Sequence, residues 1–369
     1  MRIGYFGRPI GAIGGIARHT AELLAALGRV APENEYFVYT NRPGAVPPLA
    51  GAVVRRGPAR IGRVLWEQIV VAAQLRRDRP AVYHSPDFTL PLAAGVPMIV
   101  TVHDLIYLRQ PQGTSLRAAA LYRLLTGASV RKAKRVLTVS RHAAAEVRSA
   151  FGLEGARVTV VPSGVSETLR RLAGDIPPGS APESAGVPGP YVLYVGLLTA
   201  RKGVLTLVEA FERLQESGRA GFLVLAGLQG SDYAAVATRI QASAVRERII
   251  LKGAVDDVCL ARLYASAGAF CLPSVHEGFG LTVLEAMMFG CPVVASDCSA
   301  LPEAVGDCGL LVPPEDPDAL ASALARVLED CELAADLRER GRERARRFTW
   351  DESARRTLAV YREVAEGHR

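Results

Sequence analysis

Short apolar runs alternate with longer amphipathic stretches along almost the whole of this 369-residue chain. In the first half, the apolar runs predict strands at Arg2–Phe6, Glu35–Tyr39, Val53–Arg55, Ala81–His84, Met98–Val102, Arg135–Val139 and Val158–Val161. Helices are predicted between them at Ile16–Leu27, Arg63–Arg77, Ser115–Ala133 and Arg141–Ala150. Since strands that alternate with helices usually pair in parallel, the pattern predicts a doubly wound α/β domain.

The alternation stops at residues 173–190, where Pro, Gly and Ser are frequent as in a linker. It then resumes, with strands at Tyr191–Val195, Phe222–Ala226, Ile249–Leu251, Ala269–Leu272 and Val293–Ser296, and helices at Val204–Ser217, Tyr233–Ser243, Asp256–Ser266, Leu281–Phe289, Pro317–Arg347 and Trp350–Val364. We therefore predict two Rossmann-like α/β domains, at residues 1–172 and 191–348. Residues 349–369 are expected to form a helix that either packs on the first domain or completes the second.

Composition places the chain among ordinary globular proteins, with 49% hydrophobic and 22% charged residues. The first residues lack the pattern of a signal peptide, and no apolar run approaches the roughly 18 residues that span a bilayer. All six cysteines follow residue 258, without the spacing of a metal site, which favours reduced thiols. We expect a cytoplasmic protein.

Charge is divided unevenly along the chain. Residues 1–188 hold 24 Lys and Arg against 12 Asp and Glu, and the remainder holds 20 against 25. A basic first half could meet an anionic acceptor or the inner face of a membrane. Nucleic acid is not an expected partner, because the basic residues are scattered among helices without aromatic interleaving.

The most informative stretch is residues 273–296, where an apolar strand leads through a glycine-containing loop into an apolar helix. The first backbone N–H groups of a helix have no partner within it and carry the positive end of its dipole, so this loop suits a phosphate. The amides of Leu281 and Thr282 are the candidates to bind it, and Gly278, Phe279 and Gly280 beside them are candidates to bind the rest of a nucleotide sugar.

Two carboxylates bracket that loop with seven residues between them, Glu277 before the helix and Glu285 within it. A carboxylate beside a phosphate is unfavourable unless it accepts hydrogen bonds from hydroxyl groups. The pair therefore indicates a ligand with polyol groups at both ends of a diphosphate. A structural reading, with Glu277 as a loop residue and Glu285 as a partner of the helix dipole, is the alternative.

The stretch Pro-Ser-Val-His-Glu-Gly-Phe-Gly-Leu-Thr-Val-Leu-Glu-Ala-Met-Met-Phe-Gly-Cys-Pro-Val-Val-Ala-Ser resembles the E-x(7)-E signature of retaining, nucleotide-sugar-dependent glycosyltransferases. These are the GT-B enzymes often called family 4, or glycosyl transferases group 1. The resemblance implies two Rossmann-like domains facing a central cleft, with the acceptor on the first and the nucleotide sugar mainly on the second. It also implies that Glu285 holds the ribose and Glu277 the transferred sugar.

The second domain opens with Gly196 and, immediately before a predicted helix, the cations Arg201 and Lys202. Cations at a helix N-terminus oppose the dipole, so their position favours a bound diphosphate over a solvated basic turn. In enzymes that this segment resembles, such a pair stabilises the leaving group. We therefore expect no metal and no other cofactor.

In the first domain, His103 and Asp104 follow a buried strand at the end where such sheets bind ligands. A histidine there is commonly a structural hydrogen-bonding group, whereas the resemblance places His103 beside the transferred sugar. Asp104 is an acceptor-side candidate that orients the histidine ring or simply caps a turn. His84 ends another strand and could border the acceptor. Ser140 is most simply the N-cap of the next helix, with an acceptor-side role as the alternative.

The first loop contains the paired glycines Gly14 and Gly15 at the start of a helix, followed by Arg18 and His19. The spacing is not that of a dinucleotide fingerprint. In similar enzymes this loop approaches the diphosphate or the acceptor, so the glycines are nucleotide-sugar candidates and Arg18 and His19 acceptor-side candidates. A tight strand-to-helix turn is the plain alternative.

The segments around Trp66, His84, His103 and Phe348 look most like bacterial mannosyltransferases that build surface polysaccharides from GDP-mannose. Enzymes that use UDP-glucose or UDP-N-acetylglucosamine share every phosphate motif and include enzymes with small-molecule or lipid-linked acceptors. A nucleotide-sugar epimerase and a non-catalytic sugar-nucleotide-binding protein are the alternatives from other classes.

Overall fold

The computed structural model describes residues 1–12, 14–58, 62–106, 116–218, 221–230 and 232–367. Two compact units divide the chain. Met1–Gly164 and Thr349–Arg369 form the first, and Val165–Phe348 form the second. The boundary lies at Gly164, upstream of the predicted linker.

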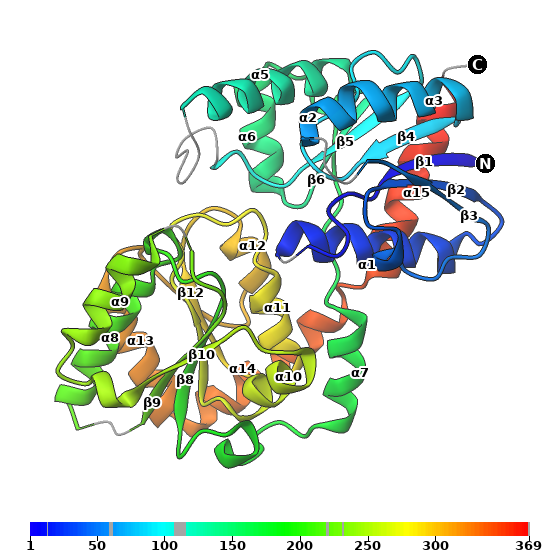
Figure 1. Cartoon of the computed structure of the whole chain (residues 1–369). Coiled ribbons are helices and arrows are strands. Elements are labelled where there is room, and N and C mark those ends of the chain that lie inside the picture. The colour runs from blue at the N-terminus through cyan, green and yellow to red at the C-terminus, as the bar shows by residue number, and fades with distance from the viewer. Residues whose placement is uncertain (13, 59–61, 107–115, 219–220, 231, 368–369) are drawn as a thin grey trace. The chain divides into compact units, whose positions relative to one another are not determined.

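The first unit contains a seven-stranded parallel sheet in the order β3-β2-β1-β4-β5-β6-β7 (Figure 1). Its strands are β1 Arg2–Phe6, β2 Glu35–Thr40, β3 Ala52–Arg56, β4 Val82–Ser85, β5 Met98–Val102, β6 Arg135–Thr138 and β7 Val158–Val160. Its helices are α1 Gly15–Val30, α2 Arg63–Leu65, α3 Ala72–Asp78, α5 Leu116–Lys132, α6 Arg141–Phe151 and α15 Trp350–Glu366. A π-helical segment, Trp66–Val71, divides the single helix predicted at Arg63–Arg77. Ser115, the predicted start of α5, lies outside the described residues.

Side chains alternate along the strands, so each face of this sheet has its own core. One core contains Tyr5 and Val38 with apolar residues of α1 and α15. The other contains Phe6 and Tyr39 with Trp66 and residues of α3 and α6. Strands buried on both faces explain the nearly continuous apolar runs in the sequence.

The C-terminal helix α15 belongs to the first unit and packs on α1. Ser353 Oγ donates to the backbone carbonyl of Pro162 at 2.5 Å, and Arg29 pairs with Asp351 at 2.7 Å. A Cβ on Gly164 would lie 2.3 Å from the backbone nitrogen of Trp350. The glycine therefore allows the chain to pass close to the start of α15.

The second unit contains a six-stranded parallel sheet in the order β10-β9-β8-β11-β12-β13. Its strands are β8 Tyr191–Val195, β9 Phe222–Ala226, β10 Ile249–Gly253, β11 Ala269–Leu272, β12 Val293–Ser296 and β13 Leu310–Val312. Its helices are α7 Glu167–Asp175, α8 Val204–Glu216, α9 Tyr233–Gln241, α10 Asp257–Ser266, α11 Leu281–Met288, α12 Leu301–Val305, α13 Pro317–Glu329 and α14 Cys331–Arg346.

Three features of the second unit differ from the sequence prediction. Helix α7 and a short 3₁₀ turn at Pro182–Ala185 lie in or beside the segment interpreted as a linker. Short β13 and α12 were not predicted. The helix predicted at Pro317–Arg347 is two helices, because Asp330 has extended backbone angles and its side chain caps α14 by accepting from the Leu333 N–H at 2.9 Å.

No helix in the described part of the chain is long and apolar enough to cross a membrane.

Candidate functional site

The loops that follow β8 and β11 lie side by side because these strands are neighbours in the second sheet. Gly203 ends the turn Ala200–Lys202 with a φ of 72°, in the left-handed region that favours glycine. A Cβ there would lie 1.9 Å from the carbonyl oxygen of Pro273. The glycine thus lets the turn that carries Arg201 and Lys202 approach the loop after β11.

A hydrogen-bonded ion pair joins the two loops. Lys202 Nζ lies 2.6 Å from Glu277 Oε1, and Ser274 Oγ donates to the same oxygen at 2.7 Å. The backbone N–H of Glu277 donates to Ser299 Oγ at 2.9 Å. The side chains of Lys202 and Glu277 are only 18% and 12% exposed, so the pair is fixed inside the site.

The electrostatic surroundings of Glu277 favour its ionised form. Burial by itself raises the pKa of Glu277, but the charge and hydrogen bond of Lys202, the hydroxyl of Ser274 and the charge of Arg201 together bring it below the usual value. Glu277 is therefore a carboxylate at neutral pH. It can accept hydrogen bonds from ligand hydroxyl groups.

Arg201 is held by the loop after β11. Its Nη1 donates to the carbonyl of His276 at 3.1 Å, and its own carbonyl accepts from the Val275 N–H at 3.1 Å. Gly196, directly after β8, donates its N–H to Ala226 at 3.0 Å. The site thus has two cations and one carboxylate at the carboxyl ends of adjacent parallel strands, where such sheets bind ligands.

Helix α11 starts at this same edge. Gly280 precedes it with a φ of 100°, and Leu281 and Thr282 provide first-turn N–H groups that have no partner within the helix. Gly278 is partly buried. The side chain of Phe279 is buried against Phe348, with ring centroids 5.8 Å apart, so this residue serves packing.

Glu285 lies deeper than its expected role suggested. It is 2% exposed, and its Oε2 accepts from the hydroxyl of Tyr264 at 3.1 Å. The structure does place it on the helix whose first turn faces the loop, so the two carboxylates of the sequence motif flank the start of α11.

In the first unit, His103 lies at the end of β5 and is 8% exposed. Its Nε2 donates to the Pro86 carbonyl at 2.9 Å, and the His19 ring packs edge-to-face on it with centroids 4.7 Å apart. His19 is itself buried, and its Nδ1 lies 2.9 Å from Ser163 Oγ. Burial lowers the pKa of both histidines, so both are neutral at pH 7. His19 thus packs against His103 and contacts Ser163 through its own Nδ1, a contact that the sequence analysis did not predict.

The prediction that His84 borders an acceptor is wrong. His84 is fully buried, with Nδ1 2.6 Å from the hydroxyl of Tyr361 and Nε2 2.8 Å from Thr101 Oγ1. Burial lowers its pKa to about 3. With both nitrogens occupied by protein groups, this histidine ties α15 to the sheet.

Ser140 is the N-cap of α6, and its Oγ accepts from the Ala143 N–H at 3.0 Å. Asp104 Oδ1 accepts from the Ile106 N–H at 3.1 Å and so closes a turn.

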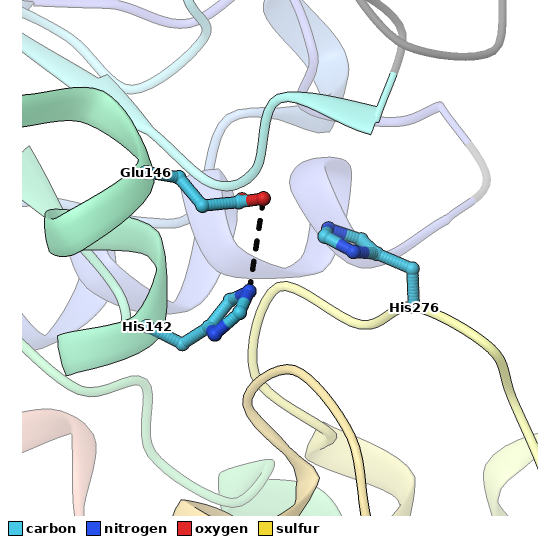
Figure 2. A group of neighbouring side chains, drawn as sticks. All are labelled: His142, Glu146 and His276. Atoms are coloured by element: carbon cyan, nitrogen blue, oxygen red, sulfur yellow. Dashed lines mark ion pairs between the residues drawn. The ribbon is translucent and has the colours of Figure 1, made fainter. Parts of the chain in front are cut away.

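Figure 2 shows two further residues of α6, His142 and Glu146, with Nε2 and Oε1 3.7 Å apart. His276, which is also labelled there, belongs to the loop after β11 in the second unit.

The paired glycines Gly14 and Gly15 stand at the exposed start of α1, which has no side-chain cap and no acidic residue in its first turn. Together with Arg8, Arg42 and Arg63 they line a pocket of about 400 Å³. The sequence reading did not single out these arginines, although Arg8 and Arg42 each lie two residues beyond a strand. Arg18 lines another hollow of about 470 Å³, which shares Gly14 and Ala17 with this pocket.

Comparison with known proteins gives matches along both units. Residues 13–169 match the family model "Glycosyltransferase Family 4", and residues 181–344 match "Glycosyl transferases group 1". The chain is 31% identical over 290 residues to O-antigen chain mannosyltransferase B of Escherichia coli, a match that covers 78% of this chain and 76% of the relative.

Solved structures agree in fold. Sucrose-phosphate synthase from Thermosynechococcus elongatus superposes with a TM-score of 0.81 and 25% identity, covering 99% of each chain. Anabaena HepE in complex with UDP and glucose has a TM-score of 0.72 and 18% identity, covering 97% of this chain and 99% of HepE. This chain therefore belongs to the GT-B glycosyltransferases, with a family 4 region followed by a glycosyl transferases group 1 region.

Proposed function

We propose that the protein is a retaining hexosyltransferase that moves a sugar from a nucleoside diphosphate to an acceptor hydroxyl group. The observation that carries the proposal is the contact between Lys202 and Glu277. In a glycosyl diphosphate, the sugar hydroxyls and the first phosphate are separated by only a few bonds. A cation and a carboxylate at hydrogen-bond distance from each other therefore suit such a ligand. The cation can bind the phosphate that is attached to the sugar, and the carboxylate can bind the sugar hydroxyls.

Each part of the donor has a proposed partner. Arg201, Lys202 and the first-turn amides of α11 would hold the diphosphate, since fixed donors and cations stabilise phosphate oxygens. Glu277 would accept from hydroxyls of the transferred sugar. Glu285 would accept from the ribose hydroxyls while the Tyr264 hydroxyl keeps its carboxylate oriented. In the first unit, His103 is the proposed sugar-facing residue.

Catalysis in this proposal is electrostatic. Negative charge grows on the diphosphate as the glycosidic bond breaks, and Arg201 and Lys202 would stabilise it without a metal ion. The acceptor hydroxyl would attack from the face that the diphosphate leaves, and a phosphate oxygen would take its proton. The product would then keep the anomeric configuration of the donor.

GDP-mannose is the proposed donor, supported by the 31% identity to a mannosyltransferase of O-antigen chains. That relative also favours a carbohydrate acceptor in surface polysaccharide synthesis. A UDP-sugar is the second candidate, since HepE, which shares the fold, was solved with UDP and glucose.

The test is a donor panel in which GDP-mannose, UDP-glucose and UDP-N-acetylglucosamine are incubated with a mixture of glycan acceptors, and the products are analysed by NMR. Transfer with an unchanged anomeric configuration is expected. An inverted product would refute the retaining mechanism. Conversion of the donor without any acceptor would favour an epimerase, and binding without turnover would favour a non-catalytic protein.

A further inference from the structure

The arginine pocket of the first unit lies at the carboxyl ends of neighbouring strands. We define it by Arg8 after β1, Asn41 and Arg42 after β2, Arg63 at the start of α2, and Asp87 after β4. The strand order β3-β2-β1-β4 brings these segments together. The pocket, of about 400 Å³, also includes the first residues of α1.

The pocket has more positive than negative charge, with three arginines and one carboxylate, Asp87. Arg63 pairs with Asp87, with Nη1 and Oδ2 2.8 Å apart, and its Nη2 donates to the Asp87 carbonyl at 2.7 Å. Within the residues that the structure describes, the guanidinium groups of Arg8 and Arg42 have no carboxylate at ion-pair distance. Two guanidinium groups thus line the pocket without an ion pair to any described carboxylate.

The surroundings both weaken and strengthen this positive field. Glu67 lies behind Arg63 and accepts from Thr89 Oγ1 at 2.6 Å, and burial raises its pKa to about 7, so it offsets only part of the charge at neutral pH. Burial, followed by repulsion from Arg63, lowers the pKa of Arg8. The uncapped start of α1 presents further N–H donors and the positive end of a 16-residue helix.

We propose that this pocket binds a phosphomonoester group of the acceptor. A phosphomonoester carries a charge near minus two at neutral pH and three strong acceptor oxygens. It therefore matches two guanidinium groups that lie beside a helix N-terminus and pair with no carboxylate among the described residues. Arg63, fixed by Asp87, orders the wall of the pocket, and Arg8 and Arg42 contact the phosphate. The inference rests on the proposed function, because it assigns the bound molecule the role of acceptor.

Binding of inorganic phosphate, followed by ³¹P NMR, tests the soluble form of this ligand. Vesicles of phosphatidylcholine with phosphatidic acid, compared with phosphatidylcholine alone, test a lipid headgroup. The variants are Arg8→Gln/Arg42→Gln in the pocket, Arg201→Gln/Lys202→Gln in the second unit, and Arg77→Gln at an exposed position of α3 as a matched control. Arg42→Gln alone, at an exposed side chain, serves if the double variant does not fold.

We expect phosphate or phosphatidic acid binding to weaken at least about tenfold in the Arg8/Arg42 variant, since each charge-assisted hydrogen bond is strong. The Arg77 variant should retain it, and the Arg201/Lys202 variant should retain the part that depends on Arg8 and Arg42. The probe that binds identifies the source of the phosphate. Binding of neither probe, or binding that does not depend on Arg8 and Arg42, overturns the inference.

Nucleoside diphosphate binding, measured on the same samples, separates this inference from the proposed function. If the wild type binds a nucleoside diphosphate but shows no phosphate binding that depends on Arg8 and Arg42, only the inference fails. If the wild type binds no nucleoside diphosphate, the proposed function fails. If the Arg8/Arg42 variant loses nucleoside diphosphate binding instead, the pocket serves the donor and the acceptor assignment is wrong.

Discussion

Lys202 Nζ lies 2.6 Å from Glu277 Oε1, although the two residues are 75 positions apart in the chain. The contact exists because β8 and β11 pair in parallel, so both loops leave the sheet at the same edge. The cation proposed to bind phosphate and the carboxylate proposed to bind the sugar therefore form an ion pair. In the absence of a ligand, each neutralises the other.

Replacing Glu277 should separate chemistry from nucleotide binding. We expect Glu277→Ala to lower transfer by roughly 100-fold or more, because the contact to the transferred sugar is lost. Affinity for the nucleoside diphosphate should be retained or rise, since Lys202 loses its competing partner. Steady-state kinetics and calorimetry measure the two effects.

Glu212 gives the matched control for that variant. It also accepts from a cation and a serine, Arg239 and Ser243, within the second unit. Glu212→Ala should leave transfer nearly unchanged. A Glu277→Ala protein that no longer binds nucleoside diphosphate would contradict the division of roles.

Activity should persist in excess EDTA, because Arg201 and Lys202 are proposed to stabilise the leaving diphosphate. The initial rate of transfer after dialysis against EDTA measures this directly. A rate that falls to background and returns with Mg²⁺ or Mn²⁺ would mean that a metal ion carries that role.

Gly203→Ala should damage both the stability of the second unit and the site. The residue has a φ of 72°, and a Cβ would lie 1.9 Å from the Pro273 carbonyl, so we expect a loss of at least about 2 kcal/mol in the free energy of unfolding. Transfer should fall as well, because the turn with Lys202 must move away.

Gly174→Ala provides the comparison for urea unfolding. A Cβ at this position of α7 meets no atom within 4 Å, so the change should be neutral or stabilise by up to about 1 kcal/mol. Equal stabilities for the two variants would show that the close approach at Gly203 does not constrain the fold.

Stability should fall as the pH decreases from about 6.5 toward 3. Burial lowers the pKa of His84 to about 3, whereas an unfolded histidine titrates near 6.5. Between these values the unfolded chain binds more protons than the folded one, so His84 contributes up to about 1.4 kcal/mol of lost stability per pH unit. Urea unfolding at several pH values measures the slope.

Carboxylates also become protonated at low pH and change the stability. The pH dependence of stability of a His84→Gln variant is therefore the reference for that of the wild type. Gln keeps hydrogen-bonding capacity toward Tyr361 and Thr101 but does not titrate. The variant should be less stable at pH 7 and show a shallower slope between pH 6.5 and 4.5. Identical slopes would mean that His84 does not protonate on unfolding in this range.

The sequence predicted most strands and long helices, because strands buried on both faces give continuous apolar runs and their helices are amphipathic. It did not predict β13, which has only three residues, or the break at Asp330, where a local side-chain cap interrupts a continuous helical pattern. Helix α7 was not predicted because its last residues belong to the Pro- and Gly-rich stretch that was interpreted as a linker.

The parts of the candidate site that are formed by residues close in sequence were predictable. The parts whose burial or contacts depend on tertiary packing were not. The loop before α11 and the turn with Arg201 and Lys202 each have local patterns. His84 is buried against Tyr361, 277 residues away, and His103 packs against His19. The arginine pocket combines single residues after separate strands, which have no shared sequence pattern.

The most direct test of the proposed donor site is calorimetric titration of the wild-type chain with GDP and UDP in metal-free buffer. We expect one of them to bind and Arg201→Gln/Lys202→Gln to weaken this binding. GDP binding would support the mannosyl donor, and UDP binding would favour a UDP-sugar. Binding of neither nucleotide would contradict the proposal that the loops after β8 and β11 hold a nucleoside diphosphate.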